Sequence, residues 1–187
     1  RLRPITNDIP KCMVKIKGKA LIDIWLETLT DAGVRSFLIN THYLSAQVEE
    51  HLNNGNFKSQ ISLVNEKRLL GTAGTIRANS SYCLKQDILL VHADNYCTAD
   101  FKEFIGVHQK RPKSCLMTLM SFRTNNPESC GILEVDENEI VHGFYEKITN
   151  PPGNLANGAV YILSPSVIDW IIKEQVSDFS CEVIPYF

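Results

Sequence analysis

Three cationic side chains near the start of the chain could neutralise a polyphosphate. Arg1, Arg3 and Lys11 fall within the first eleven residues, and Pro4 and Pro10 stiffen this segment. Arginine offers a planar fork that binds phosphate oxygens in pairs, and lysine offers a compact charge. The same charges also suit a solvated surface segment, since most Lys and Arg side chains are exposed. From charge alone, the surface interpretation is favoured.

A glycine-rich turn before a predicted helix could contact a nucleotide. Gly71 has no side chain, so a planar base could approach the backbone, and the backbone groups of Gly71 and Thr72 could read its edge. The alternative is an ordinary helix entry, with Gly74 inside the helix. A turn of this kind is weak evidence for nucleotide contact when it stands alone.

One carboxylate follows the most continuous apolar run of the chain. Ile88-Leu89-Leu90-Val91 is typical of a buried strand, and Asp94 comes shortly after it. A carboxylate at the carboxyl end of a buried strand is placed to hold Mg²⁺, which prefers oxygen ligands and bridges phosphates. For an isolated aspartate, a turn or helix-cap role is the alternative.

The elements that must position these residues alternate along the first two thirds of the chain. The apolar spacing predicts helices over residues 21–29, 44–52, 72–82 and 100–108, and strands over 37–39, 61–64, 87–92 and 114–122. This order predicts an α/β fold with a Rossmann-like, mixed but mostly parallel sheet flanked by helices. Ligands bind such sheets beyond the carboxyl ends of the strands, which selects the loops after Val64, Val91, Phe122 and the 144–145 strand.

The pattern changes after Phe122. Residues 131–135 and 140–147 predict a hairpin, residues 158–163 a strand, and Ser164-Pro165 the start of a helix. Asp100 with Glu103 resembles a capping box. Because we find no repeat and no linker, we expect a single domain over residues 1–187, incomplete at both termini since the pattern is cut at each end.

The bulk properties exclude several classes of protein. A formal net charge of -2 gives no basis for binding nucleic acid or an acidic membrane, so a few placed cations must do any phosphate binding. No apolar run reaches the length of a membrane span. The six cysteines are scattered without a C-x-x-C pair, which favours reduced thiols in a cytoplasmic protein.

Taken in order, the segments resemble those of the sugar nucleotidyltransferases, the nucleoside-diphosphate-sugar pyrophosphorylases. The resemblance extends over essentially the whole chain, through the segments 1–6, 10–22, 65–76, 89–95, 130–135, 144–147 and 157–161. Ala20 stands where the family usually has proline, Ala93 replaces a glycine, and Asn157-Gly158-Ala159 changes a commoner order of Asn, Ala and Gly. The mannose or manno-heptose 1-phosphate guanylyltransferase branch is the most similar.

The resemblance implies a GT-A-like nucleotidyltransferase domain and a role for each matching residue. Those roles are Arg1 and Lys11 as catalytic cations, Asp94 as an Mg²⁺ ligand, Glu66, Gly71 and Thr72 in nucleotide binding, and Gly131, Glu146, Lys147 and Asn157 in sugar-phosphate binding. A second metal-binding aspartate is expected beyond Phe187. Without the resemblance, Glu146-Lys147 would be interpreted as an exposed cross-strand pair of little energetic value.

The implied reaction joins a nucleoside triphosphate, with GTP favoured, to a sugar 1-phosphate, for precursors of cell-surface polysaccharide. A homo-oligomer is possible. Two alternatives stay open. A glycosyltransferase that uses an NDP-sugar would share the fold but normally has a D-x-D motif, whereas Asp94 is followed by Asn95-Tyr96. A non-catalytic regulatory homologue is supported by Ala93 and by the changed order at 157–159.

Overall fold

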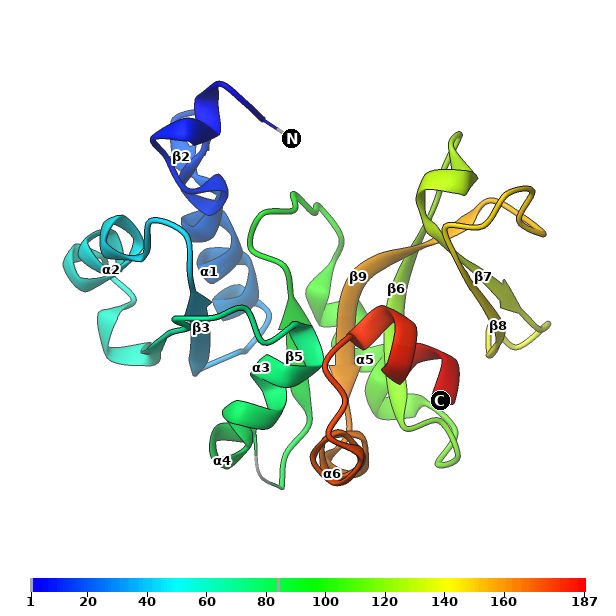
Figure 1. Cartoon of the computed structure of the whole chain (residues 1–187). Helices are drawn as coiled ribbons and strands as arrows, with labels where there is room; N and C mark the ends of the chain where they lie inside the picture. The colour runs from blue at the N-terminus through cyan, green and yellow to red at the C-terminus, as the bar shows by residue number, and fades with distance from the viewer. Residues whose placement is uncertain (1, 84) are drawn as a thin grey trace. The chain divides into compact units, whose positions relative to one another are not determined.

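The computed structural model describes residues 2–83 and 85–187, which form two compact units (Figure 1). The first unit comprises the described residues up to Leu69 together with His92–Phe104. The second comprises Leu70–Val91, apart from Leu84, and Ile105–Phe187. The expectation of one domain over residues 1–187 stays a prediction.

The first unit contains two long helices and a pair of parallel strands. Its elements are η1 (Ile5–Asn7), η2 (Lys11–Met13), β1 (Lys15–Ile16), β2 (Lys19–Ala20), α1 (Leu21–Asp31), β3 (Phe37–Thr41), α2 (Ser45–Asn54), η3 (Lys58–Gln60) and β4 (Ile61–Asn65). Strands β3 and β4 pair in parallel, with Phe37 opposite Ile61 and Thr41 opposite Asn65. The helices and strands predicted over residues 21–64 are therefore confirmed.

Helix α1 shows why these elements could be predicted. Its apolar residues recur at helical spacing, and Leu21, Ile22, Trp25, Leu26 and Leu29 are all buried. Gly33, at a φ of 104°, ends the helix with a backbone conformation that favours glycine. Helix α2 buries Val48 and Leu52 in the same way.

The second unit is built around a five-stranded sheet. Its elements are α3 (Thr72–Ala78), α4 (Ser80–Cys83), β5 (Ile88–Val91), β6 (Met117–Arg123), η4 (Pro127–Ser129), β7 (Gly131–Val135), β8 (Val141–Glu146), β9 (Leu155–Leu163), α6 (Pro165–Glu174), η5 (Phe179–Val183) and η6 (Ile184–Tyr186). Helix α5 (Phe101–Lys110) begins in the first unit and continues into the second. None of the described helices is long and apolar enough to cross a membrane.

The mixed α/β class is confirmed, but the pairing in this sheet is more antiparallel than expected. The strand order is β5-β9-β7-β8, with β6 on β9, and the ladders among these described strands are antiparallel. Strand β9 lies between β5 and β6, where Leu163 pairs with both Ile88 and Met117 (Figure 1). A β-α-β order predicts that successive strands run in the same direction. It does not reveal that a later strand inserts between them in the opposite direction.

The core of the second unit joins β9 and α6 to the segment at the end of the chain. Tyr161 and Leu163 pack in one buried cluster with Ile171, Phe179 and Val183, and residues of α3 also belong to it. Phe179 lies against Tyr161 with ring centroids 4.6 Å apart. This packing holds residues 179–183 against the structure that carries the glycine-rich turn.

The structure refines three of the predicted helices, one by a break and two at their starts. The helix expected over 72–82 breaks at Asn79, whose side-chain amide donates to the Thr75 carbonyl, and continues as α4. Asp100 caps α5, because its carboxylate accepts the Lys102 and Glu103 N–H groups at 2.8 and 3.1 Å. Ser164 occupies the N-cap of α6, with Pro165 in the first turn, but its hydroxyl makes no cap hydrogen bond.

Candidate functional site

In the first unit, the predicted cation and the predicted metal ligand meet. Lys11 Nζ lies 3.0 Å from Asp94 Oδ2, although the two residues are far apart in sequence. The Lys11 side chain is 51% exposed and the Asp94 side chain is 39% exposed, so water and a charged ligand can both reach them. An exposed pair of this kind contributes little to stability, and this suits groups that exchange partners when a ligand arrives.

The loop that carries Asp94 is held by aromatic residues of the same unit. The buried indole of Trp25 donates from Nε1 to the Asn95 carbonyl at 2.7 Å. The Trp25 ring also packs edge-on against Phe101, at a centroid distance of 5.5 Å. Trp25 was predicted only as part of an apolar helix face, so its second role, fixing the residue next to Asp94, was missed.

Asp94 supplies one accessible carboxylate, the kind of oxygen ligand that Mg²⁺ uses. Among the described residues, no group of three or more His, Cys, Asp or Glu side chains could hold a metal by itself. Mg²⁺ is usually bound through one or two carboxylates together with substrate phosphates and water. One accessible carboxylate beside a lysine is consistent with that mode of binding.

The other candidate residues in the first 69 residues of the chain are Arg1 and Glu66. Arg1 lies outside the described residues. Glu66 follows β4 and is only 6% exposed. Its backbone N–H donates to the Thr41 carbonyl at 2.8 Å, and its carbonyl accepts from His42 Nδ1 at 2.7 Å. These bonds hold Glu66 at the carboxyl end of the parallel strand pair, where the rule for α/β sheets places ligands.

In the second unit, Gly71 and Thr72 form the entry to α3. Gly71 is the N-cap and has φ 78° and ψ 162°, a combination that essentially only glycine adopts. A Cβ atom at this position would overlap the Ser177 carbonyl oxygen. The glycine is therefore required twice, once by the backbone angles and once by the close approach of another segment.

The residue that approaches Gly71 was not identified from the sequence. The Ser177 carbonyl accepts the N–H groups of Ala73 and Gly74 at 3.0 and 3.3 Å. Residues 71 and 177 are too distant in the chain for any local spacing to reveal the contact. The sequence identified only the Gly71-Thr72-Ala73-Gly74 turn, which is one of the two segments that form this contact.

The structure also brings three of the predicted sugar-phosphate residues together. Gly131 pairs with Glu146 in the β7–β8 ladder, and a Cβ atom at Gly131 would meet the Glu146 carboxylate. Lys147 Nζ lies 2.6 Å from Glu146 Oε1, and this hydrogen bond raises the pKa of Lys147. Lys147 is 64% exposed, so its charge remains available to a phosphate.

Asn157 lies in β9 next to this pair, but its amide has partners within its own strand. Ile132 pairs with Ala156, so Asn157 falls opposite Gly131 in the same antiparallel ladder. Its Nδ2 donates to the Tyr161 hydroxyl at 2.7 Å, and its Oδ1 accepts the Ala159 N–H at 3.0 Å. Burial raises the pKa of Tyr161 to about 12, and the charge of Glu146 adds to the rise. The tyrosine hydroxyl therefore stays protonated beside the glutamate.

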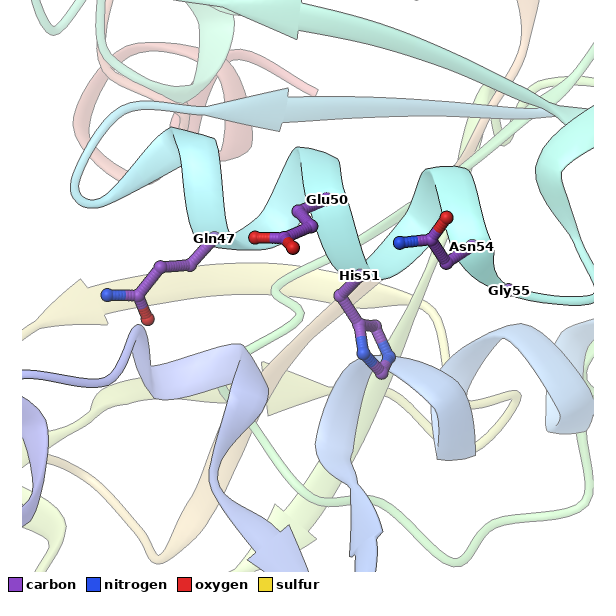
Figure 2. A pocket seen from close by; sticks show the side chains of 5 residues that line it. All are labelled: Gln47, Glu50, His51, Asn54 and Gly55. Atoms are coloured by element: carbon purple, nitrogen blue, oxygen red, sulfur yellow. The ribbon is translucent and has the colours of Figure 1, made fainter.

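A large open depression lies elsewhere in the first unit. It has a volume of about 420 Å³ and is lined by Gln47, Glu50, His51, Asn54 and Gly55, of α2 and its end (Figure 2). His51 points away from α2 (Figure 2). Its Nε2 lies 2.8 Å from Asp23 Oδ1 of α1. None of the predicted site residues lines this depression, and its wall is a solvated helix face.

Cys12 provides a prediction about the surroundings of Lys11 and Asp94. Burial raises the pKa of the Cys12 thiol to about 11, and the negative charge of Asp94 adds to the rise. At pH 8 only about one thiol in a thousand is then ionised, and the thiolate is the reactive form. We expect iodoacetamide to modify Cys12 far more slowly in the folded protein than in urea, as measured by peptide mass spectrometry. Equal rates in the two states would contradict this environment.

Solved structures similar to this chain define its fold as a Rossmann-like fold of the GT-A type. HddC from Yersinia pseudotuberculosis superposes with a TM-score of 0.80 at 26% identity, over 100% of this chain and 81% of that chain. An apo UDP-glucose pyrophosphorylase superposes with a TM-score of 0.78 over 92% of this chain and 75% of that chain; at 20% identity it supports the fold alone.

The chain belongs to the nucleotidyl transferase family, whose family model matches residues 1–186. It is 29% identical to a putative mannose-1-phosphate guanyltransferase of Sulfolobus acidocaldarius, over 100% of this chain and 54% of that protein. It is 31% identical to a mannose-1-phosphate guanylyltransferase of Mycobacterium tuberculosis, over 99% of this chain and 51% of that protein. The chain thus spans about half the length of the curated relatives it matches. The family predicted from the sequence is confirmed.

Proposed function

We propose that the protein transfers a nucleotide from a nucleoside triphosphate to a sugar 1-phosphate, giving an NDP-sugar and pyrophosphate. The observation that carries the proposal is the meeting of Lys11 and Asp94 at 3.0 Å, each in a segment that matches the family. The reaction brings two anions together, so it needs a cation and a metal-binding carboxylate near the reacting phosphates. The names of the relatives support the same reaction.

The atoms of this reaction balance without any further reactant. A phosphate oxygen of the sugar 1-phosphate attacks the α-phosphorus and forms a new P–O bond. The bond from the α-phosphorus to the oxygen bridging to the β-phosphate breaks, and pyrophosphate leaves with that electron pair. In this reaction Arg1 and Lys11 neutralise the triphosphate, and Lys147 holds the sugar phosphate. Positioning and charge neutralisation provide most of the catalysis in such transfers.

Asp94 is the residue that would hold Mg²⁺ in this proposal. When bound, the ion supplies charge neutralisation on the phosphate oxygens. Because Lys11 Nζ contacts the Asp94 carboxylate, Lys11 would turn towards the phosphates if Mg²⁺ occupied that carboxylate. We expect EDTA to abolish pyrophosphate release and excess Mg²⁺ to restore it. Full activity in EDTA would contradict the role of Asp94.

The remaining roles concern the base and the sugar. Gly71 and Thr72, with Glu66, would bind the nucleotide, and Glu146 with Gly131 and Asn157 would bind the sugar. We favour GTP with mannose or manno-heptose 1-phosphate, because several relatives are named as mannose-1-phosphate guanylyltransferases and one HddC structure is a complex with GMP-PN. We also propose that the protein is located in the cytoplasm and forms a homo-oligomer.

The deciding experiment measures pyrophosphate release by the protein at its full natural length. A panel of GTP, UTP, dTTP, ATP and CTP is combined with mannose, manno-heptose and glucose 1-phosphates in Mg²⁺ buffer. Release with one pair, and with neither substrate alone, supports the proposal and assigns the specificity. Sugar transfer from an NDP-sugar without pyrophosphate would indicate a glycosyltransferase. Nucleotide binding without turnover of any pair would indicate a regulatory homologue.

A further inference from the structure

The segment after α6 makes a specific contact with the glycine-rich turn. Ser177 points its carbonyl at the first turn of α3, where it accepts the N–H groups of Ala73 and Gly74. The first N–H groups of a helix have no partner within the helix and need an acceptor from outside. Here a backbone carbonyl from the end of the chain supplies it. Arg77, near the end of α3, donates to the Gln175 carbonyl and adds a second link to the same segment.

A single carboxylate folds this segment into the conformation that makes the contact. Glu182 Oε2 accepts the N–H groups of Ser177 and Asp178 at 2.9 and 2.6 Å. These two backbone bonds lower the pKa of Glu182, so it is ionised at neutral pH. Asp178 adds a shorter-range bond by accepting the Cys181 N–H at 2.7 Å.

The amide of Ser177 is therefore held by Glu182 while the carbonyl of Ser177 is presented to α3. The opposite ends of one residue connect the carboxylate to the start of the helix. Gly71 lies against the same carbonyl, so a shift of Ser177 would either press on Gly71 or break the hydrogen bonds that the carbonyl accepts from Ala73 and Gly74. The orientation of the peptide groups at Gly71 and Thr72 thus depends on Glu182.

We propose that Glu182 is a positioning residue for recognition of the nucleotide base. It touches neither the base nor the reacting phosphates, and acts by holding Ser177 so that the Gly71–Thr72 backbone is already arranged when the nucleotide binds. Backbone groups that are arranged in advance bind without an ordering cost, and disordering them weakens binding. This inference rests on the proposed function, because it assumes that the turn binds a nucleotide.

Three variants separate this role from a simple effect on stability. Glu182→Ala removes the acceptor, Glu182→Gln keeps an oxygen that can accept both N–H groups, and Glu182→Asp keeps the charge but shortens the reach. Glu174→Ala is the matched control, since Glu174 is exposed, lies at the end of α6 and forms an ion pair with its neighbour Lys173.

The first measurement is hydrogen exchange at the amides of Ala73 and Gly74, read against the amides of β9 as an internal reference. We expect faster exchange at both amides in Glu182→Ala, with β9 unchanged, and wild-type rates in Glu174→Ala and Glu182→Gln. Exchange in Glu182→Ala that is unchanged, or raised equally throughout β9, would overturn the positioning role. This measurement requires no ligand, so it is valid whether or not the proposed function holds.

The second measurement is the Kd for GTP and for UTP, together with steady-state kinetics. We expect the Kd for the nucleotide that binds to rise about tenfold in Glu182→Ala, because the acceptor of the Ser177 and Asp178 N–H groups is lost, and less in Glu182→Asp. The KM for the triphosphate should rise in parallel, while the KM for the sugar 1-phosphate stays within about twofold. In Glu182→Gln, we expect the Kd and the KM for the triphosphate to return close to their wild-type values.

The outcomes distinguish the two claims. A wild-type Kd in Glu182→Ala, or a Kd in Glu182→Gln as weak as in Glu182→Ala, overturns the inference and leaves the proposed function intact. If the wild-type protein binds neither triphosphate, both the proposed nucleotide binding and the role of Glu182 in base recognition are overturned. The exchange rates still decide whether Glu182 holds the turn in place. If Glu182→Ala does not fold, Glu182→Asp must weaken binding more than Glu182→Gln, and the reverse order overturns the inference.

Discussion

Replacing Lys11 with alanine is expected to lower turnover by about a hundred- to a thousandfold while the fold stays intact, the usual effect of losing one electrostatic stabiliser. Lys11 is the described cation that lies against Asp94, and it belongs to a segment that matches the family. Its exposed pairing contributes little to folding, so the midpoint of thermal unfolding should hardly change. The measurements are pyrophosphate release and circular dichroism on the same preparation.

Lys19→Ala is the control for this prediction. Lys19 is an exposed lysine of the same unit, with a side chain 48% exposed, and it pairs with Glu27 at 2.5 Å. Removing it takes away the same charge and a similar ion pair, but leaves Asp94 untouched. We expect turnover near that of wild type in this variant. Wild-type turnover in Lys11→Ala, or an equal loss in both variants, would contradict the assignment of Lys11.

Replacing Gly71 with alanine is expected to abolish measurable nucleotide binding and to destabilise the second unit. The backbone angles of Gly71 are costly for any residue with a Cβ atom, by about 1–3 kcal/mol. The added methyl group would also overlap the Ser177 carbonyl, and a backbone group that accepts two helix N–H groups cannot move without breaking those bonds. Nucleotide binding by calorimetry and thermal unfolding measure the two effects.

Gly106→Ala provides the matched control. Gly106 lies within α5, and a Cβ atom there would meet no atom within 4 Å. Alanine in a helix interior is favoured over glycine by about 0.5–1 kcal/mol, so this variant should unfold at a slightly higher temperature and bind nucleotide normally. If Gly71→Ala bound nucleotide as well as Gly106→Ala does, the close approach of Ser177 would have no functional meaning.

Much of the secondary structure could be predicted because local patterns carry it. The apolar spacing of α1 and the continuous run of β5 each determine an element regardless of the rest of the chain. The split between α3 and α4 could not be predicted, because it depends on an Asn79 side chain that competes for a backbone carbonyl within the helix.

The candidate site was predictable where one short segment carries the chemistry. Lys11, Asp94, Gly71 and the Glu146-Lys147 pair were each selected by their own neighbours in the sequence. Asn157 was selected in the same way, yet its amide is engaged with Tyr161 and Ala159, and this depends on a β9 conformation in which Ala159 has a φ of 55°. Its role in binding sugar stays a prediction.

Local sequence patterns sufficed to predict the family, most of the element order and the segments that carry charge or glycine, because each depends on residues close together in the chain. Folding brings distant residues together: Lys11 with Asp94, Trp25 with Asn95, and Ser177 with the start of α3. The tertiary structure also decided that β9 enters the sheet antiparallel. The reason is physical, since hydrogen bonds and ion pairs act over a few ångströms in space, whereas sequence patterns report only neighbours along the chain.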